Sequence, residues 1–204
     1  MKIKTLISVA LALVIFSCVQ ITFAQKVDET QGNFIFSEQI TPASVLELTT
    51  TLEDWSSENP DLPIRITLNS PGGDVLASFA LVDELNHLRN KGHKLTIAVY
   101  GMAASAAAWV LQAADYRIIG ANSTILIHEI SSGSQGKLSD LKASMARSQS
   151  LQDQFLKLLA KRSRLTIKLM HLRIDGGKDW WLSADEAKRF GLVDEIEPVR
   201  APQN

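Results

Sequence analysis

The sequence predicts an α/β fold. Short β-branched runs alternate along the chain with longer segments whose apolar residues recur at helical spacing. That alternation is typical of a sheet covered by helices. Turn signals rich in Pro, Gly and Asn separate the two kinds of segment. The 204 residues, 46% of them hydrophobic and 21% charged, suit one globular domain.

The first half of the chain begins with a strand and a helix. Residues 33–40 alternate apolar and polar side chains and predict a strand. Thr41 is expected to cap a helix over 42–55, because a proline follows it in the first helical position. A second strand is predicted over 64–68. It ends in the dense turn signal Asn69-Ser70-Pro71-Gly72-Gly73.

The next segments repeat this order. Asp74 is expected to cap a second helix, which the Asn-Lys-Gly of residues 90–92 would end. A third strand is predicted over 94–100. It leads through a turn at Gly101 and Met102 into an alanine-rich helix that begins at Ser105.

The second half of the chain contains two short strands, a long helix and a last strand–helix–strand unit. The long helix, 138–164, carries only a thin apolar stripe, so we expect it to leave the body and meet a partner. The other predicted elements are strands over 116–120 and 124–127, a polar loop over 131–136, an apolar segment at 180–183, a helix over 184–190 and a closing strand over 191–194.

The first 24 residues are predicted to be a secretory signal. Two lysines precede an apolar core, and a small residue, Ala24, ends the segment. Cleavage there predicts a periplasmic or secreted protein. The alternatives are an uncleaved membrane anchor over 5–24, which is 20 residues long, and a lipid on Cys18 in a lipobox-like setting. Residues 25–32 are expected to be flexible and 198–204 to be a tail.

Charge and cysteine usage exclude several classes of function. With a formal charge of −1, the chain has no excess of basic residues of the kind that nucleic-acid-binding proteins show. Cys18 is the only cysteine, so a chain cleaved after Ala24 would have no thiol nucleophile and no cysteine-based metal site. We expect no metal and no cofactor.

Ser105 is the candidate nucleophile. Its Oγ is expected at a strand-to-helix turn, over the free N–H groups of a helix start, which favour negative charge. The Ala106 N–H would be available to an oxyanion, and Gly72-Gly73 lets a second backbone segment approach a ligand closely. The alternative is structural: a small-residue helix packed tightly on a sheet, and an ordinary Pro-Gly-Gly turn.

A nucleophilic serine needs a base, and the base needs a carboxylate. Among the four histidines, His128 directly follows an apolar strand and can project into a cleft, although an edge histidine without catalytic role fits that position equally well. Seven downstream acids are candidate carboxylates, and periodicity does not choose Asp179 over Asp175. The seven are Asp140, Asp153, Asp175, Asp179, Asp185, Glu186 and Asp194.

Several motifs, in order, resemble the proteolytic subunit of the Clp protease, ClpP, within the broader crotonase-like group. The resemblance covers roughly 33–196. Family-like spacing separates Ser105, His128 and Asp179, at 23 and 51 residues. The motifs are Glu58-Asn59-Pro60, Asn69-Ser70-Pro71-Gly72-Gly73, Gly101-Met102-Ala103-Ala104-Ser105, Ile125-Leu126-Ile127-His128, Asp179-Trp180-Trp181-Leu182-Ser183-Ala184, Glu186-Ala187 and Gly191-Leu192-Val193-Asp194.

The resemblance implies a fold of repeated ββα units with a protruding long handle helix, and a serine peptidase domain over 33–197. It implies Ser105 as nucleophile, His128 as base and Asp179 as orienting carboxylate. It further implies Gly73 and Ala106 as the oxyanion-hole donors. The handle helix implies a homo-oligomer, a heptameric ring that can stack on a second ring.

The predicted function is therefore that of an exported, ATP-independent serine endopeptidase acting on short or unfolded peptides. An ATP-driven AAA+ unfoldase is not expected as a partner, because an exported protein would lack ATP and the N-terminus is short. The alternatives are a Ser-Lys peptidase resembling the signal peptide peptidase SppA, and a non-catalytic ring scaffold that binds peptides. Acyl-CoA chemistry on the same fold ranks last, because it would not need all three residues.

Overall fold

The computed structural model describes residues 31–199 and confirms the predicted α/β fold. The strands are β1 (Gly32–Phe36), β2 (Ile64–Ser70), β3 (Leu95–Ala104), β4 (Tyr116–Gly120), β5 (Thr124–Ile127), β6 (Trp180–Ser183) and β7 (Glu195–Glu197). The helices are α1 (Pro42–Glu58), α2 (Val75–Asn90), α3 (Ala106–Val110), α4 (Leu138–Arg162), α5 (Ile167–Ile174) and α6 (Ala184–Arg189), with a 3-10 turn, η1, at Leu111–Ala113.

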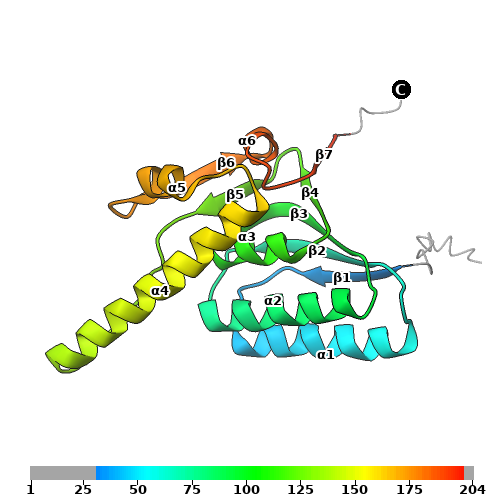
Figure 1. Ribbon diagram of the computed structural model, residues 1–204. Coiled ribbons are helices and arrows are strands. Elements are labelled where there is room, and N and C mark those ends of the chain that lie inside the picture. The colour runs from blue at the N-terminus through cyan, green and yellow to red at the C-terminus, as the bar shows by residue number, and fades with distance from the viewer. Residues whose placement is uncertain (1–30, 200–204) are drawn as a thin grey trace, which may run out of the picture.

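A parallel sheet in the order β1-β2-β3-β4-β7 forms the centre of the molecule (Figure 1). Helices α1 and α2 lie side by side across one face of it. The alternating burial of β2 points every second side chain into the core beneath these helices. The long aliphatic side chains there, including Leu52, Leu85 and Ile97, are fully buried.

The start of α1 is set by the residues that predicted it. Thr41 Oγ1 accepts a hydrogen bond from the Ser44 N–H at 3.1 Å, and Ser44 Oγ accepts one from the Thr41 N–H at 2.9 Å. This reciprocal cap satisfies two backbone donors that have no partner within the helix. The cap also positions the preceding residue, Ile40, which forms a parallel bridge with Gly73.

Strand β3 is longer than predicted, and the expected turn at Gly101 and Met102 is wrong. Residues 96–99 pair with β4, whereas residues 102–104 pair with β5. Gly101 (φ +105°) allows the strand to bend between its two partners. A Cβ at Gly101 would lie 2.4 Å from Asn69 Oδ1, the atom that accepts a hydrogen bond from the Met102 N–H at 3.1 Å. The chain therefore stays extended as far as Ser105.

The closing strand is also displaced from its predicted place at 191–194. Leu192 and Val193 are buried in a loop, and β7 begins only at Glu195, directly after the predicted segment. Asp194 instead accepts hydrogen bonds from the Arg117 guanidinium at 2.9 and 2.7 Å and from the Arg117 N–H at 2.9 Å. Burial alone would raise the pKa of Asp194, but these hydrogen bonds outweigh it and lower the pKa. Asp194 thus has a structural role in binding Arg117.

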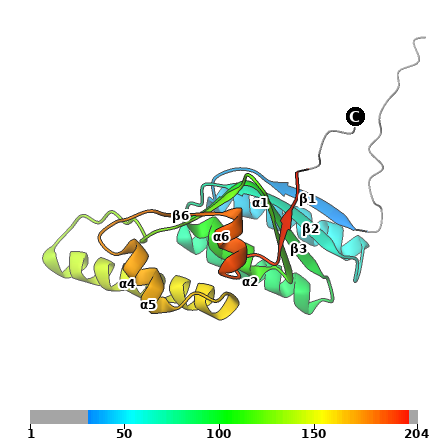
Figure 2. The same cartoon turned by 90° about the horizontal axis from the view of Figure 1, so that it is seen from above.

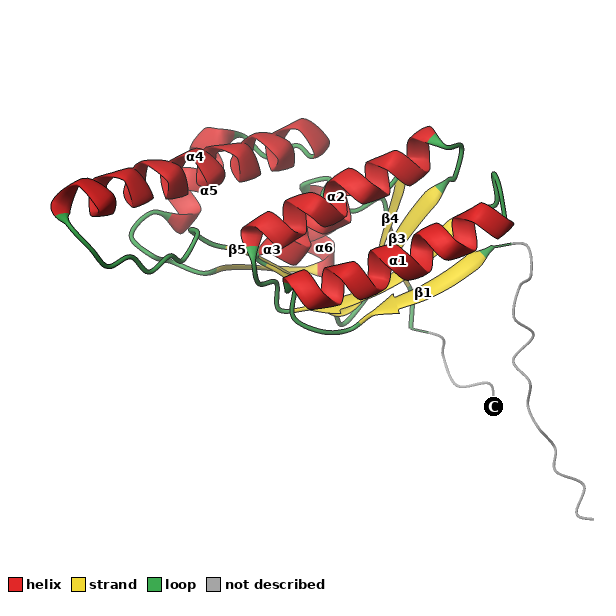
Figure 3. Ribbon diagram, turned by 90° about the horizontal axis from the view of Figure 1, so that it is seen from below, coloured by secondary structure: helices red, strands yellow, loops and turns green. Residues whose placement is uncertain are grey.

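Helix α4 projects from the body, as its sequence pattern predicts (Figure 2). Its buried residues, Gln152, Phe155, Leu156 and Leu159, all lie in its second half. In the first half, Leu138 and Met145 are 68% and 73% exposed. Figure 3, the view from below, shows α4 extending beyond the helices that cover the sheet. Within residues 31–199, no helix has the length and apolar character to cross a membrane.

Candidate active site

Ser105 occupies a strained backbone position between β3 and α3. Its φ of 55° and ψ of −123° are unusual for a residue with a side chain, and such conformations cluster at functional sites. The Ser105 N–H donates to the Leu126 carbonyl of β5 at 2.9 Å, which fixes the serine against that strand. Because α3 has only five residues, its dipole is small, and the nearby N–H groups matter more than the helix.

The Gly72-Gly73 turn lies directly against Ser105. A Cβ at Gly72 (φ +86°) would lie 2.5 Å from the Ala104 carbonyl oxygen, 2.9 Å from Ser105 Cβ and 3.0 Å from the Ala106 nitrogen. No other residue type fits that space. The turn is held by Ser70 Oγ, fully buried, which accepts a hydrogen bond from the Gly72 N–H at 3.1 Å. The structure therefore brings together the two small-residue turns that the sequence singled out.

Both predicted oxyanion donors have a free N–H. The N–H groups of Gly73 and Ala106 donate to no residue in the described part of the chain, whereas Gly72 and Ser105 on either side are hydrogen-bonded. A Cβ at Gly73 (φ +148°) would lie 2.1 Å from the Ile40 carbonyl oxygen. The parallel bridge to Ile40 thus requires glycine, and it keeps this segment in place.

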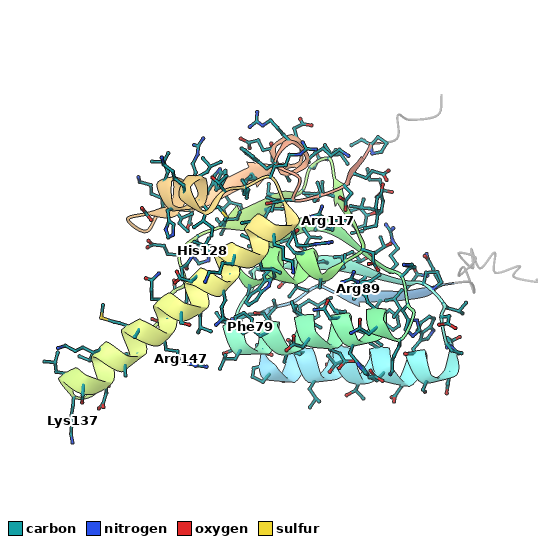
Figure 4. The ribbon with its side chains drawn as sticks, viewed as in Figure 1. Phe79, Arg89, Arg117, His128, Lys137 and Arg147 are labelled. Carbon is teal, nitrogen blue, oxygen red and sulfur yellow. The ribbon has the colours of Figure 1, made fainter. Side chains whose placement is uncertain are left out.

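His128 shares a cavity with Ser105. It follows the last residue of β5, is half-buried and lines the same hollow as the serine. Figure 4 shows it beside α4, whose Phe155 contributes to the same wall. The placement agrees with the expectation that a residue ending this strand can enter a cleft.

The other three histidines have local partners. His93 is 2% exposed, and its ring nitrogens lie 2.8 Å from Ser56 Oγ and 2.7 Å from the Leu62 carbonyl oxygen. His87 lies 3.8 Å from Glu53 on the surface, and His171 lies 3.3 Å from Asp175. None of the three lines the Ser105 cavity.

Five of the seven candidate carboxylates are engaged elsewhere. Asp140 accepts from the Lys137 N–H at the start of α4, Asp153 from Gln149, and Glu186 from the Ser183 N–H at the start of α6. Asp175 pairs with His171, and Asp194 with Arg117. Only Asp179 and Asp185 have no hydrogen-bond partner within residues 31–199.

The pairing of β5 with β6 ends next to His128 and Asp179. The antiparallel register joins Leu126 to Trp181 and Ile127 to Trp180, and one further residue of the same register would place the exposed Asp179 opposite His128. Facing residues in such a pair have Cβ atoms about 4.5–5.5 Å apart, within reach of a carboxylate–imidazole hydrogen bond. Asp185 lies beyond β6, on α6.

Ser105 and His128 line one cavity, whereas Asp179 is exposed and is not among the residues that line it. Within the described residues, no hydrogen bond joins Ser105 to His128 or His128 to Asp179, and no three His, Cys, Asp or Glu side chains group as metal ligands. Catalytic hydrogen bonds are often loose in a free enzyme and tighten when substrate binds.

Gln152 is a residue of the site that the sequence did not single out. It is 7% exposed on α4, and its Oε1 accepts a hydrogen bond from the Ile130 N–H at 2.7 Å. Ile130 lies two residues after His128 and lines the Ser105 cavity. The available signal was a polar residue within the apolar stripe of α4, at helical spacing from Phe155 and Leu159.

Replacing Gln152 by leucine is expected to lower kcat/KM for a peptide substrate by about tenfold. The Ile130 N–H would lose its acceptor, at a cost of about 1–3 kcal/mol, and the segment after His128 would shift. The matched control is Gln149→Leu, an exposed glutamine of the same helix, which should leave activity unchanged. Steady-state kinetics compare the two. Equal activities of Gln152→Leu and Gln149→Leu would show that this contact does not position the site.

A comparison with known proteins covers most of the chain. A family model described as Clp protease matches residues 21–200. The match includes Ser105, His128, Asp179 and the Gly72-Gly73 turn.

Proposed function

The chain belongs to the Clp protease family and is a serine-type peptidase with the ClpP/crotonase-like fold, and on that premise we propose that Ser105, His128 and Asp179 are its catalytic triad. The observation that carries the proposal is the single cavity lined by Ser105 and His128, next to a serine with strained backbone dihedrals. The β5–β6 register, continued by one residue, supports Asp179 as the carboxylate.

In the proposed mechanism, Ser105 Oγ attacks the carbonyl carbon of the scissile peptide bond as a ring nitrogen of His128 takes the hydroxyl proton. The C–N bond then breaks, and His128 gives that proton to the leaving amine. Water, deprotonated in turn by His128, attacks the acyl carbon of the ester, and the bond from that carbon to Ser105 Oγ breaks as His128 gives the proton to the serine. Asp179 stabilises the imidazolium that forms in each half-reaction.

The N–H groups of Gly73 and Ala106 would hold the negative charge that develops on the carbonyl oxygen. Both are free, and the turn that carries Gly73 packs against Ala106. In other enzymes one such donor contributes about 2.7–4 kcal/mol to lowering the barrier. Because both donors are backbone groups on packed segments, they need no rearrangement when charge appears.

The test of the nucleophile is labelling with a fluorophosphonate probe, which reacts with activated serines. We expect wild-type protein to be labelled at Ser105 and Ser105→Ala not to be labelled. Ser70→Ala is unsuitable as a control because it loosens the glycine turn, whereas Ser57→Ala, an exposed serine of α1, should label like wild type. Labelling of Ser105→Ala to the wild-type extent would refute the assignment.

The described structure gives no support to a Ser-Lys dyad. No lysine is among the residues that line the Ser105 cavity, so a lysine base would require a rearranged site. A non-catalytic, peptide-binding scaffold would bind peptide and remain unlabelled, so the same experiment separates it from the peptidase.

We propose that this peptidase is exported, works without ATP and acts as an endopeptidase on short or unfolded peptides. The reasons are the signal-like residues 1–24, which lie outside the described part of the chain, and the absence of ATP outside the cell. On this proposal the domain spans 33–197, between a flexible segment over 25–32 and a tail over 198–204. Retention of 1–24 as an anchor, or a lipid on Cys18, would keep the same enzyme at a membrane.

We also propose that seven copies of the chain form a ring in which the bodies of neighbouring copies contact one another. In this arrangement α4 remains free to contact a second ring. The uncovered first half of α4 supports this, because Leu138 and Met145 expose most of their apolar surface. Such exposed apolar side chains are typical of interaction surfaces.

Native mass spectrometry tests both proposals on one sample. We expect a subunit that lacks residues 1–24 and an assembly of seven or fourteen subunits. A monomer of cleaved chains would contradict the ring, whereas a full-length subunit in an intact ring would contradict the cleavage.

A further inference from the structure

A hollow at the C-terminal end of α4 gathers positive charge away from the Ser105 cavity. It is open to solvent, has a volume of about 520 Å³ and shares no lining residue with that cavity. Figure 4 shows Arg117, which lines the hollow, apart from His128. The charged lining residues are five bases, Arg117, Lys161, Arg162, Arg164 and Lys188, and two acids, Asp115 and Asp194.

Both acids are already neutralised by an arginine. Asp194 Oδ1 lies 2.7 Å from Arg117 Nη2. Asp115 Oδ1 lies 2.6 Å from Nη2 of Arg89, which is not a lining residue. Within residues 31–199, none of the other four bases of the lining forms an ion pair with a carboxylate. The hollow therefore contains four cations whose charge is not compensated.

The two unpaired arginines are held in place by backbone carbonyl groups. Arg162 Nη2 donates a hydrogen bond to the Ala114 carbonyl oxygen at 2.6 Å. Arg164 Nη1 donates one to the Arg189 carbonyl oxygen at 3.0 Å. A neutral carbonyl oxygen fixes the direction of a guanidinium but does not cancel its charge. These contacts therefore hold two cations at the hollow and leave them available to an anion.

Arg162 is the cation with the strongest need for an anion. It is half-buried, and its Nε has neither solvent contact nor a hydrogen-bond partner within residues 31–199. Burial lowers the pKa of Arg162, and the positive charges of Arg117 and Arg89 lower it further. The nearby carboxylates oppose this effect only in part. An anion in the hollow would stabilise the charged guanidinium by direct attraction.

We propose that this hollow binds a phosphate group, carried either by a soluble compound or by a lipid headgroup. Its unpaired cations come from three segments: the end of α4, the loop that follows it, and α6. A phosphate dianion presents oxygens in several directions to such a set, whereas a carboxylate presents two oxygens in one plane. Arginine is also well suited to phosphate recognition. The inference does not depend on the role of Ser105.

The experiment is calorimetric titration of the full chain with inorganic phosphate at constant ionic strength. We expect one saturable site per chain. Acetate should bind about tenfold more weakly, because it offers fewer charged hydrogen bonds. Arg162→Gln should raise the Kd for phosphate about tenfold, the effect of losing one such bond.

Two further variants complete the titration. Lys161→Gln should raise the Kd about threefold, because Lys161 is exposed, and it tests the site even if the change at Arg162 disturbs the end of α4. Arg147→Gln is the matched control. It removes the same charge from an exposed position in the first half of α4 and should bind phosphate like wild type.

Sedimentation with phosphatidylcholine vesicles that contain or lack phosphatidic acid identifies the source of the phosphate group. Cosedimentation that needs phosphatidic acid, and that is weakened in Arg162→Gln but not in Arg147→Gln, would support a lipid headgroup. Phosphate binding in solution without such cosedimentation would support a soluble compound. No saturable binding to phosphate or to these vesicles would refute the site, as would equal binding by wild type, Arg162→Gln and Lys161→Gln.

Discussion

His128→Ala is expected to lower kcat/KM for peptide hydrolysis by about 10⁴- to 10⁶-fold, as loss of the base does in other serine triads. Without the imidazole, the Ser105 proton has no acceptor in the cavity, since the remaining lining residues are apolar apart from the serine itself. The free N–H groups of Gly73 and Ala106 would still bind the carbonyl oxygen. A small residual rate is therefore expected, together with a KM close to that of wild type.

The control is His171→Ala, because His171 is a half-buried histidine that pairs with Asp175 and does not line the cavity. It should keep wild-type kinetics. Unfolding midpoints of both variants show whether any loss reflects folding. Full activity of a folded His128→Ala variant would exclude the triad and favour a lysine base.

The helix and strand pattern was predictable where local chemistry alone sets the element. The Thr41–Pro42 signal gave the correct start of α1, because the cap involves side chains only three residues apart. The strand predicted over residues 64–68 is present as β2, one face of which is buried under helices. Helix α4 was predicted from residue 138 to within two residues of its end.

Elements defined by contacts distant in sequence were not predictable. A glycine such as Gly101 is normally a turn signal, but here it lets β3 change its pairing partner from β4 to β5. That pairing joins residues that are distant in sequence, so no local pattern predicts it. The apolar residues Leu192 and Val193 predicted a strand, yet they fill the core from a loop because Asp194 is tied to Arg117. Helix α5, residues 167–174, had no clear periodic signal.

The candidate site was predictable as a set of residues but not as an arrangement. From spacing alone, Ser105 and His128 could each have had a purely structural role, and Asp179 was one of several candidate acids. The structure narrows the choice by assigning His93, His171 and Asp175 to other contacts. It also adds Gln152, which contacts the segment after His128 from α4. The role of Gln152 depends on how α4 packs against that segment, which no motif records.

Ser105 illustrates how the fold prepares a position for chemistry. A non-glycine residue with φ of 55° and ψ of −123° is disfavoured by about 1–3 kcal/mol. The cost is offset by the hydrogen bond to Leu126, by the glycine turn that packs against its backbone, and by the surrounding buried alanines. These contacts hold the serine close to the end of β5, which His128 follows.

Asp179→Asn is the second variant for which we expect a large effect, a loss of about 10³- to 10⁴-fold in kcat with little change in KM. An amide can still form a hydrogen bond to His128, but it favours the wrong tautomer and provides no charge to stabilise the imidazolium. Asp179 follows a turn in which Gly176 and Gly177 have φ of +79° and +74°, and the Lys178 N–H is bonded to the Ile174 carbonyl. That turn ends α5 and starts the strand that pairs with β5.

Asp185→Asn is the matched control, because Asp185 is the other candidate acid without a hydrogen-bond partner in the described part of the chain. It lies in the first turn of α6, so its replacement should cost no more than a few tenths of a kcal/mol in stability and leave kcat unchanged. Steady-state rates of hydrolysis of one peptide ester and one peptide amide provide a second comparison between the variants. An amide needs protonation of its leaving group by His128, so Asp179→Asn should impair amide hydrolysis more than ester hydrolysis. Equal rates for Asp179→Asn and wild type would show that the imidazole is oriented by a group other than Asp179.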